Sequence, residues 1–215
     1  MTDWAAMFER EAARYADGEA RLGDGSDERQ RQLTRMGNAA WGAGLCRLMD
    51  GGDDAGEWLE RAAERWRESY PDAPAGSWGR PIGAIKALVL AGDWAGAEDA
   101  ARWALAEGAA EAESPIGRYA AALACSVLAD WEQVRVHADT IRIRDDFPRD
   151  VGDALAMISA EDVVGYVEAV ESVLESFETR EDYLEDVPIA DTVIVLQALA
   201  GRRDMAAHLS SGLLP

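Results

Sequence analysis

Few residues of this sequence have the types and spacing that metal or nucleophilic chemistry requires. His137 and His208 are the only histidines, and neither has a second histidine four residues away. Cys46 and Cys125 stand apart, without a C-x-x-C pair. Zinc needs three or four nitrogen, sulfur or oxygen ligands at suitable spacing. The sequence therefore predicts no metal site, and we expect two buried free thiols in a reducing compartment.

Carboxylates are abundant but do not form a recognisable site. Asp145, Asp146, Asp150 and Asp153 could hold a cation, yet they lack the alternating ligands and the turn glycine of a calcium loop, so a solvated surface is favoured. The sequence does not show which of the 41 acidic residues would form a pair of carboxylates for general acid–base catalysis. The chain also lacks G-x-S-x-G, a phosphate-binding P-loop and G-x-G-x-x-G after a strand. We assign no catalytic or cofactor-binding residues, and enzymatic activity stays open as an alternative.

The charge balance indicates the solvent to which this protein is adapted. The chain has 41 acidic and 21 basic residues, Lys86 is its only lysine, and its formal charge is −20. Such self-repulsion is screened only at high salt. The composition resembles that of haloarchaeal proteins, although binding of basic partners is an alternative explanation. The basic pairs Arg142/Arg144 and Arg202/Arg203 lie among acids, so we expect no nucleic-acid binding.

The hydropathy pattern predicts neither a membrane span nor a signal peptide. No apolar run reaches about 18 residues, and the chain opens on an amphipathic pattern without a basic and then apolar leader. We expect a cytoplasmic protein with no membrane association.

One short pattern recurs along the chain and predicts helix–turn–helix corners. An Asp follows a short apolar stretch and precedes another, and aspartate is a good N-cap. The copies lie 32 to 42 residues apart, a period typical of stacked helical hairpins. The four copies are Gly92-Asp93-Trp94, Ala129-Asp130-Trp131, Glu161-Asp162-Val163 and Arg203-Asp204-Met205, with a blurred fifth at Asp53-Asp54-Ala55.

The residues after each Asp test the repeat. Positions one, four, eight and eleven residues on share one helical face, and after Asp93, Asp130 and Asp162 all of them are apolar. These residues are Trp94, Ala97, Ala101, Ala104, Trp131, Val134, Ala138, Ile141, Val163, Tyr166, Val170 and Val173. The copy at Asp54 is looser, and the one at Asp204 is truncated as in a solenoid cap.

The corner pattern resembles the tetratricopeptide repeat, most closely at Gly92-Asp93-Trp94 with Ala97 and Ala104. The resemblance covers roughly residues 40–212, but its large aromatic at the eighth position is replaced by Ala101, Ala138 and Val170, and the period varies. It implies an all-α array of antiparallel helical hairpins. We expect about eleven helices in one domain over 1–215, with an N-terminal extension over 1–37 and about five units over 38–211.

Three loops between the expected hairpins are longer than the corners: 69–81, 144–150 and 179–188. Long irregular loops in compact arrays are often functional. Trp78 and Arg80 are of types that anchor interfaces, and with Tyr183 they form the candidate partner-binding set. The alternative is that Trp78 covers the end of the next hairpin and Arg80 pairs with a surface acid.

Stacked hairpins expose a long concave face, which favours a protein-binding module over an enzyme or small-molecule sensor. A second resemblance is to an all-helical toxin-immunity family, whose members bind and neutralise a toxin without catalysis. It rests on Trp78-Gly79-Arg80-Pro81 leading into 88–93, and on Tyr183-Leu184 through Val187-Pro188 to Leu213-Leu214-Pro215. The partner, and the oligomeric state, are left open.

Overall fold

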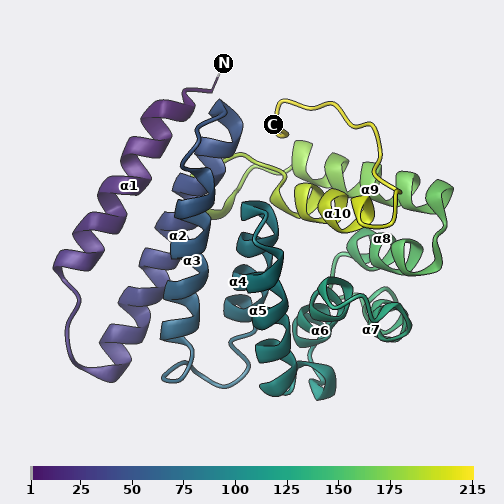
Figure 1. The fold of residues 1–215 in the computed structure, drawn as a ribbon, viewed down its shortest axis with the longest axis horizontal. Helices are drawn as coiled ribbons and strands as arrows, with labels where there is room; N and C mark the ends of the chain where they lie inside the picture. Colours follow the sequence, from purple (N-terminus) through teal and green to yellow (C-terminus); the bar gives the residue numbers. More distant parts are fainter. Residues whose placement is uncertain (1) are drawn as a thin grey trace.

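The computed structural model describes residues 2–215, which form α-helices joined by loops and short turns (Figure 1). This part of the chain contains no β-strand, so the all-α expectation is confirmed, with ten α-helices instead of about eleven. The elements are α1 (Trp4–Ala20), α2 (Ser26–Asp50), α3 (Ala55–Ser69), α4 (Gly79–Ala91), α5 (Trp94–Ala106), η1 (Ala109–Glu111), α6 (Pro115–Val127), α7 (Trp131–Ile141), α8 (Arg149–Ala160), α9 (Val163–Glu178), η2 (Leu184–Asp186) and α10 (Asp191–Gly201), where η1 and η2 are 3₁₀ turns.

Three of the predicted corner aspartates are N-caps. Each carboxylate accepts a hydrogen bond from the backbone N–H three residues on, at 2.9 Å for Asp93, 3.3 Å for Asp130 and 3.0 Å for Asp162. The residue before each aspartate has a left-handed backbone and ends the preceding helix. These residues are Gly92 (φ 76°), Ala129 (φ 58°) and Glu161 (φ 57°).

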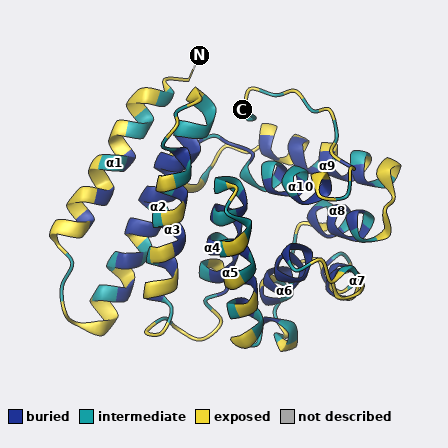
Figure 2. Ribbon diagram, in the orientation of Figure 1, coloured by how far each residue is buried: buried dark blue, intermediate teal, exposed yellow. Residues whose placement is uncertain are grey.

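The helical face that follows these caps packs into the core, as Figure 2 illustrates for the array as a whole. The positions four, eight and eleven residues after each capping aspartate are buried. The first position is half-buried in Trp94 and Trp131 but exposed in Val163. Burial of these faces therefore links each corner to the core.

The fourth corner differs from the prediction. Asp204 itself has the left-handed backbone, with φ 56°, and Met205 donates from its N–H to the Ala200 carbonyl at 3.0 Å. The pattern is thus shifted by one residue, so Asp204 ends α10 and caps no following helix. Residues 205–211 have no regular secondary structure, and the Gln197 side chain binds them by accepting a hydrogen bond from the Ala207 N–H at 2.9 Å and donating to its carbonyl at 2.5 Å.

The corner predicted at Asp54, the least regular copy of the pattern, also differs from the prediction. Asp54 precedes α3 but makes no capping hydrogen bond. Its carboxylate accepts from Arg47 Nε at 2.5 Å and from Trp58 Nε1 at 3.3 Å instead. The Arg47 guanidinium holds the pKa of Asp54 below its usual value. Upstream, α2 runs without interruption across residue 37, where the N-terminal extension was expected to end.

Helices pack mainly on their neighbours in sequence, but α10 returns to the middle of the molecule and contacts α4, α8 and α9. Figure 1 shows the segment between α9 and α10 reaching back toward α2. Two arginines at the end of α10 hold it there. Arg202 donates to the Val127 carbonyl at 2.6 Å, at the end of α6, and Arg203 donates to the Ile158 carbonyl at 2.7 Å, in the last turn of α8. Cations at helix C-termini are stabilising.

Candidate functional site

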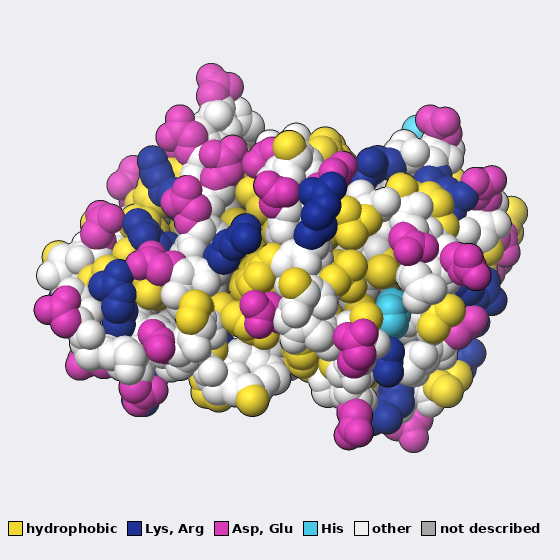
Figure 3. Space-filling model, turned by 60° about the horizontal axis from the view of Figure 1, so that its bottom comes forward, with side chains coloured by type: hydrophobic (Ala, Val, Ile, Leu, Met, Phe, Trp, Pro, Cys, Tyr) yellow, Lys and Arg dark blue, Asp and Glu magenta, His cyan; other side chains and the backbone are white. Residues whose placement is uncertain are grey.

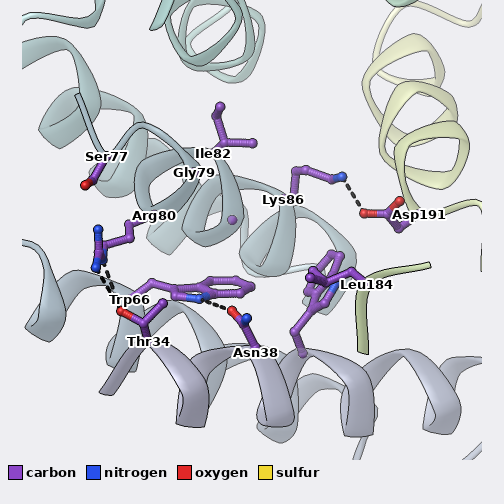
Figure 4. A pocket seen from close by; sticks show the side chains of 12 residues that line it. Thr34, Asn38, Trp66, Ser77, Gly79, Arg80, Ile82, Lys86, Leu184 and Asp191 are labelled. Carbon is purple, nitrogen blue, oxygen red and sulfur yellow. Dashed lines mark hydrogen bonds and ion pairs between the residues drawn. The ribbon is translucent and has the colours of Figure 1, made fainter. Parts of the chain in front are cut away.

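A pocket of about 380 Å³ lies where the C-terminal segment meets α2, α3 and α4 (Figure 4). Its lining comes from parts of the chain that are far apart in sequence, and most of it is apolar. The lining residues are Thr34, Asn38 and Trp41 of α2, Trp66 of α3, Ser77, Gly79, Arg80, Ile82, Gly83 and Lys86 in and before α4, and Leu184 and Asp191.

The indole of Trp66 is wedged between two helices at the back of the pocket. A Cβ atom at Gly37 of α2 or at Gly83 of α4 would lie 2.7 Å from the ring, so both positions require glycine for this close approach. The ring is oriented by a hydrogen bond of 3.0 Å from Trp66 Nε1 to Asn38 Oδ1. Trp41 lies beside it, with ring centroids 5.9 Å apart. The pocket therefore has a fixed aromatic wall.

Arg80 lies at one end of the pocket and has no acidic partner. Its Nε donates to Ser69 Oγ at 2.8 Å and its Nη2 donates to Gln30 Oε1 at 2.6 Å and to Thr34 Oγ1 at 3.0 Å. Within residues 2–215 no carboxylate oxygen lies within 4.0 Å of this guanidinium. Burial lowers the pKa of Arg80; the nearby Tyr70 hydroxyl acts in the opposite direction, and no carboxylate does.

Lys86 and Asp191 lie at the opposite end of the pocket from Arg80 (Figure 4). Lys86 Nζ forms an ion pair with Asp191, donates to Thr192 Oγ1 at 3.1 Å, and lies 5.7 Å from the centre of the Trp41 ring. Both charged side chains are largely buried, at 10% and 19% exposure. The only lysine of the chain thus neutralises an aspartate at the start of α10.

The 3₁₀ turn η2 forms one edge of the pocket. Leu184 borders the pocket and is 57% exposed. Glu185 fixes the turn to the first two helices, because it forms an ion pair with Arg14 and accepts from Asn38 Nδ2 at 3.1 Å. Arg14 also pairs with Glu11 at 2.7 Å, a carboxylate whose pKa is raised by burial. Contacts to α1 and α2 therefore fix the position of Leu184.

The structure places the three predicted partner-binding residues in different surroundings. Arg80 lines the pocket, whereas Trp78 is only 9% exposed and packs in the core against Gly117 of α6. The Tyr183 hydroxyl donates to the Phe177 carbonyl, and its neighbour Leu184, not Tyr183 itself, reaches the pocket. Trp78 is therefore buried against α6, and Arg80 lacks the surface acid that the alternative gave it.

Sequence reasoning missed most of the pocket. The spacing of Thr34, Asn38 and Trp41 on one face of α2 and the single lysine were available signals. Tertiary packing places Trp66, Leu184 and Asp191 beside that face, and no pattern in the sequence indicates these positions.

The other candidate groups form no second site in the described part of the chain. Cys46 and Cys125 are buried free thiols, and burial raises their pKa values to about 12 and about 11. His137 is buried in α7 and its Nδ1 has no partner. Asp146 pairs with Arg144, and Asp153 with Arg142 and Arg149.

Residues 2–215 contain neither a cluster of metal-ligating side chains nor a membrane-spanning helix. No three His, Cys, Asp or Glu side chains there come together in a way that would hold a metal ion. None of the helices in this range has the length and apolar character needed to span a bilayer.

Comparison with models of known protein families, with curated protein sequences and with solved structures found no match to this chain.

Proposed function

We propose that this chain is a non-enzymatic protein-binding module whose helix pairs form a tetratricopeptide-like superhelix. The packing of successive helices and the three aspartate-capped corners support this arrangement. In this arrangement α10 and the segment before it lie along the inner side of the array, against α4 and α2. Binding is therefore concentrated at the pocket and not spread along the whole concave face.

The observation that carries the proposal is the pocket between α2, α4 and η2. It has an aromatic wall fixed by packing and a guanidinium that lacks a carboxylate. Interface hot spots combine such apolar recesses with arginine. The two opposite charges at the other end, Lys86 and Asp191, neutralise each other. Their pairing favours a role in holding α10 over a role in acid–base chemistry.

The finer proposal is a toxin-neutralising immunity-type protein acting in the cytoplasm of a halophile. In support, two of the sequence blocks that carry that resemblance supply Arg80 and Leu184, and both residues line the pocket. Acidic side chains are scattered over the visible face in Figure 3, mostly toward its edge and among basic ones, with hydrophobic side chains gathered near its middle. A toxin encoded beside this chain, whose growth arrest is relieved by co-expression of this protein, would support this reading. Unrelieved arrest would contradict it.

A second candidate function is small-molecule binding, as a sensor or an enzyme. The pocket volume of about 380 Å³ favours it, because ligand sites typically occupy ~300–1,000 Å³. A bound metabolite that copurifies with the protein in stoichiometric amount would support this candidate.

The test is affinity capture from a native extract at high salt, with mass spectrometry of the retained molecules. The informative variant is Leu184→Asp, which places a charge at the exposed edge of the pocket. Its matched control is Val164→Asp, because Val164 is also an exposed aliphatic residue, at 70%, but lies on α9 outside the pocket. We expect one protein partner that is retained by the wild type and by Val164→Asp and lost by Leu184→Asp. Equal retention by all three proteins, or no protein partner, would contradict the proposal.

A further inference from the structure

A second hollow adjoins the pocket and shares Thr34, Ser77 and Arg80 with it. It is open to solvent, has a volume of about 560 Å³, and lies between α2 and the loop before α4. Its remaining lining residues are Asp27, Gln30, Arg31, Arg35 and Pro74. The apolar pocket thus continues into a polar recess, with Arg80 at the junction of the two.

The polar recess carries two positive charges that no acid matches. Arg31 forms an ion pair with Asp27, but neither Arg35 nor Arg80 has a carboxylate within 4.0 Å among residues 2–215. Fifteen of the 21 basic residues are ion-paired within residues 2–215, as expected with 41 acids. Two unmatched arginines in one recess therefore distinguish it from the surrounding surface.

Hydrogen-bond donors remain available in this recess. Arg80 uses Nε and Nη2 for contacts with Ser69, Thr34 and Gln30, and its Nη1 makes no hydrogen bond to the described residues. The first turn of α4 adds no donor after Gly79, because the Arg80 N–H donates to the Ser77 carbonyl at 3.2 Å and Pro81 has no N–H. An arginine held in this way presents a pre-oriented donor to an anion, and a carboxylate matches the geometry of its donors.

We infer that the joined hollows bind a protein segment that presents a carboxylate next to a large apolar side chain. The carboxylate lies against Arg35 and Arg80, and the apolar side chain lies against Trp66 and Ile82. This inference rests on the proposed protein-binding function and names the chemistry of its partner. The negative charge of the remaining surface repels acidic segments in general. Recognition therefore requires the apolar group and the carboxylate together.

A pair of small probes tests this chemistry directly. Phenylacetate and phenylacetamide have the same ring and differ in carrying a carboxylate or an amide. Each is titrated at one fixed KCl concentration, with the side-chain N–H signals of isotope-labelled arginine followed by NMR and tryptophan fluorescence as a second readout. We expect phenylacetate to bind about tenfold more tightly, because charge-assisted hydrogen bonds exceed neutral ones. Equal affinity for the two probes, or binding of neither, would overturn the inference.

Substitutions of single arginines test whether the preference for phenylacetate arises in the polar recess. Arg35→Gln and Arg80→Gln should each reduce the preference for phenylacetate toward parity. Arg67→Gln is the matched control, since Arg67 is an exposed arginine that stacks on Trp103 and lines neither hollow. If Arg80→Gln does not fold, the test rests on Arg35→Gln. The Arg35 side chain is exposed, so its substitution should leave the fold intact. A preference that survives Arg35→Gln would overturn the two-arginine site.

The capture experiment tests the proposed function and the probe experiment tests this inference, so one can be contradicted while the other stands. A protein partner lost in Leu184→Asp, together with equal binding of the two probes, removes this inference and leaves the proposed function standing. A clear preference for phenylacetate without any captured protein removes the proposed function and favours a small anionic ligand.

Discussion

Lys86 and Asp191 form a largely buried ion pair between α4 and the first turn of α10, across 105 residues of sequence. Asp191 lines the apolar pocket, while its neighbour Thr192 lines a further hollow of about 340 Å³ beside α6 and α9. The pair therefore joins α4 to α10 at the boundary between two hollows.

Removing both members of this pair should be less damaging than the sum of the two single removals. Lys86→Met leaves a largely buried carboxylate without its partner, and we expect the free energy of unfolding to fall by about 3 kcal/mol. Asp191→Asn should have a similar effect, and the double variant should lose less than the sum. Denaturant titration of the four proteins at constant high salt measures the coupling. Additive losses would show that the two charges do not stabilise each other.

Substitutions at two equivalent corner positions should change the melting temperature in opposite directions. Ala129 and Gly92 both have left-handed backbones before a capping aspartate, a conformation that costs about 1 kcal/mol for residues with a Cβ. Ala129→Gly should raise the melting temperature, and Gly92→Ala should lower it, each through a change of about 1 kcal/mol. Thermal unfolding followed by circular dichroism provides the comparison. A shift in the same direction for both substitutions would contradict the corner model.

His137 should make stability depend on pH. Burial, followed by the nearby Arg118, lowers its pKa, so the folded state keeps it neutral while the unfolded state takes up a proton near pH ~6.5. Its contribution to stability is complete above that pH and is lost as the pH falls below it. His137→Leu should therefore flatten the fall in the free energy of unfolding between about pH 7 and 5.5. An equally steep fall in the His137→Leu variant would contradict this assignment.

Substitution of Trp78 should affect the stability of the fold more than it affects partner binding. Because it is buried against α6, Trp78→Ala should lower the free energy of unfolding by about 3–5 kcal/mol. Trp78→Phe should retain most of the stability because it keeps an aromatic ring in the site. Urea titration gives both values. A fully stable Trp78→Ala protein that no longer captures its partner would instead make Trp78 an interface anchor.

The acidic surface should make folding depend on salt. Dilution from about 1 M KCl to about 50 mM should reduce the helical circular dichroism signal, because the Debye length grows and the acids repel one another. The loss should be broad, since every α-helix except α4 and α6 carries acidic residues. An unchanged signal and melting temperature at low salt would contradict adaptation to a salty cytoplasm.

The parts of the fold that local chemistry determines could be predicted from the sequence. Asp93, Asp130 and Asp162 cap helices because the cap involves residues only three positions apart. Asp204 was mispredicted because a shift of one residue converts an N-cap into a helix end, and only the contacts of Gln197 with the tail reveal it. Local sequence does not contain that information.

The candidate site could be predicted only in part. Arg80 was identified by residue type and by its place in a proline-rich loop. Trp78 in the same loop has an equally suitable type, but its burial depends on Gly117 in a later helix. Trp66 could not be recognised as a pocket wall because two glycines, in α2 and α4, together create the slot for its ring.

The turn η2 has a consequence for how the protein is made. Glu185 binds Arg14 and Asn38, and Leu184 borders the pocket, yet both residues are synthesised long after α1 to α4. The early helices can pack during synthesis because their contacts are local in sequence. The pocket is therefore completed only after η2 and Asp191 have been synthesised, and a nascent chain halted before η2 would carry α1 to α4 without that edge of the pocket.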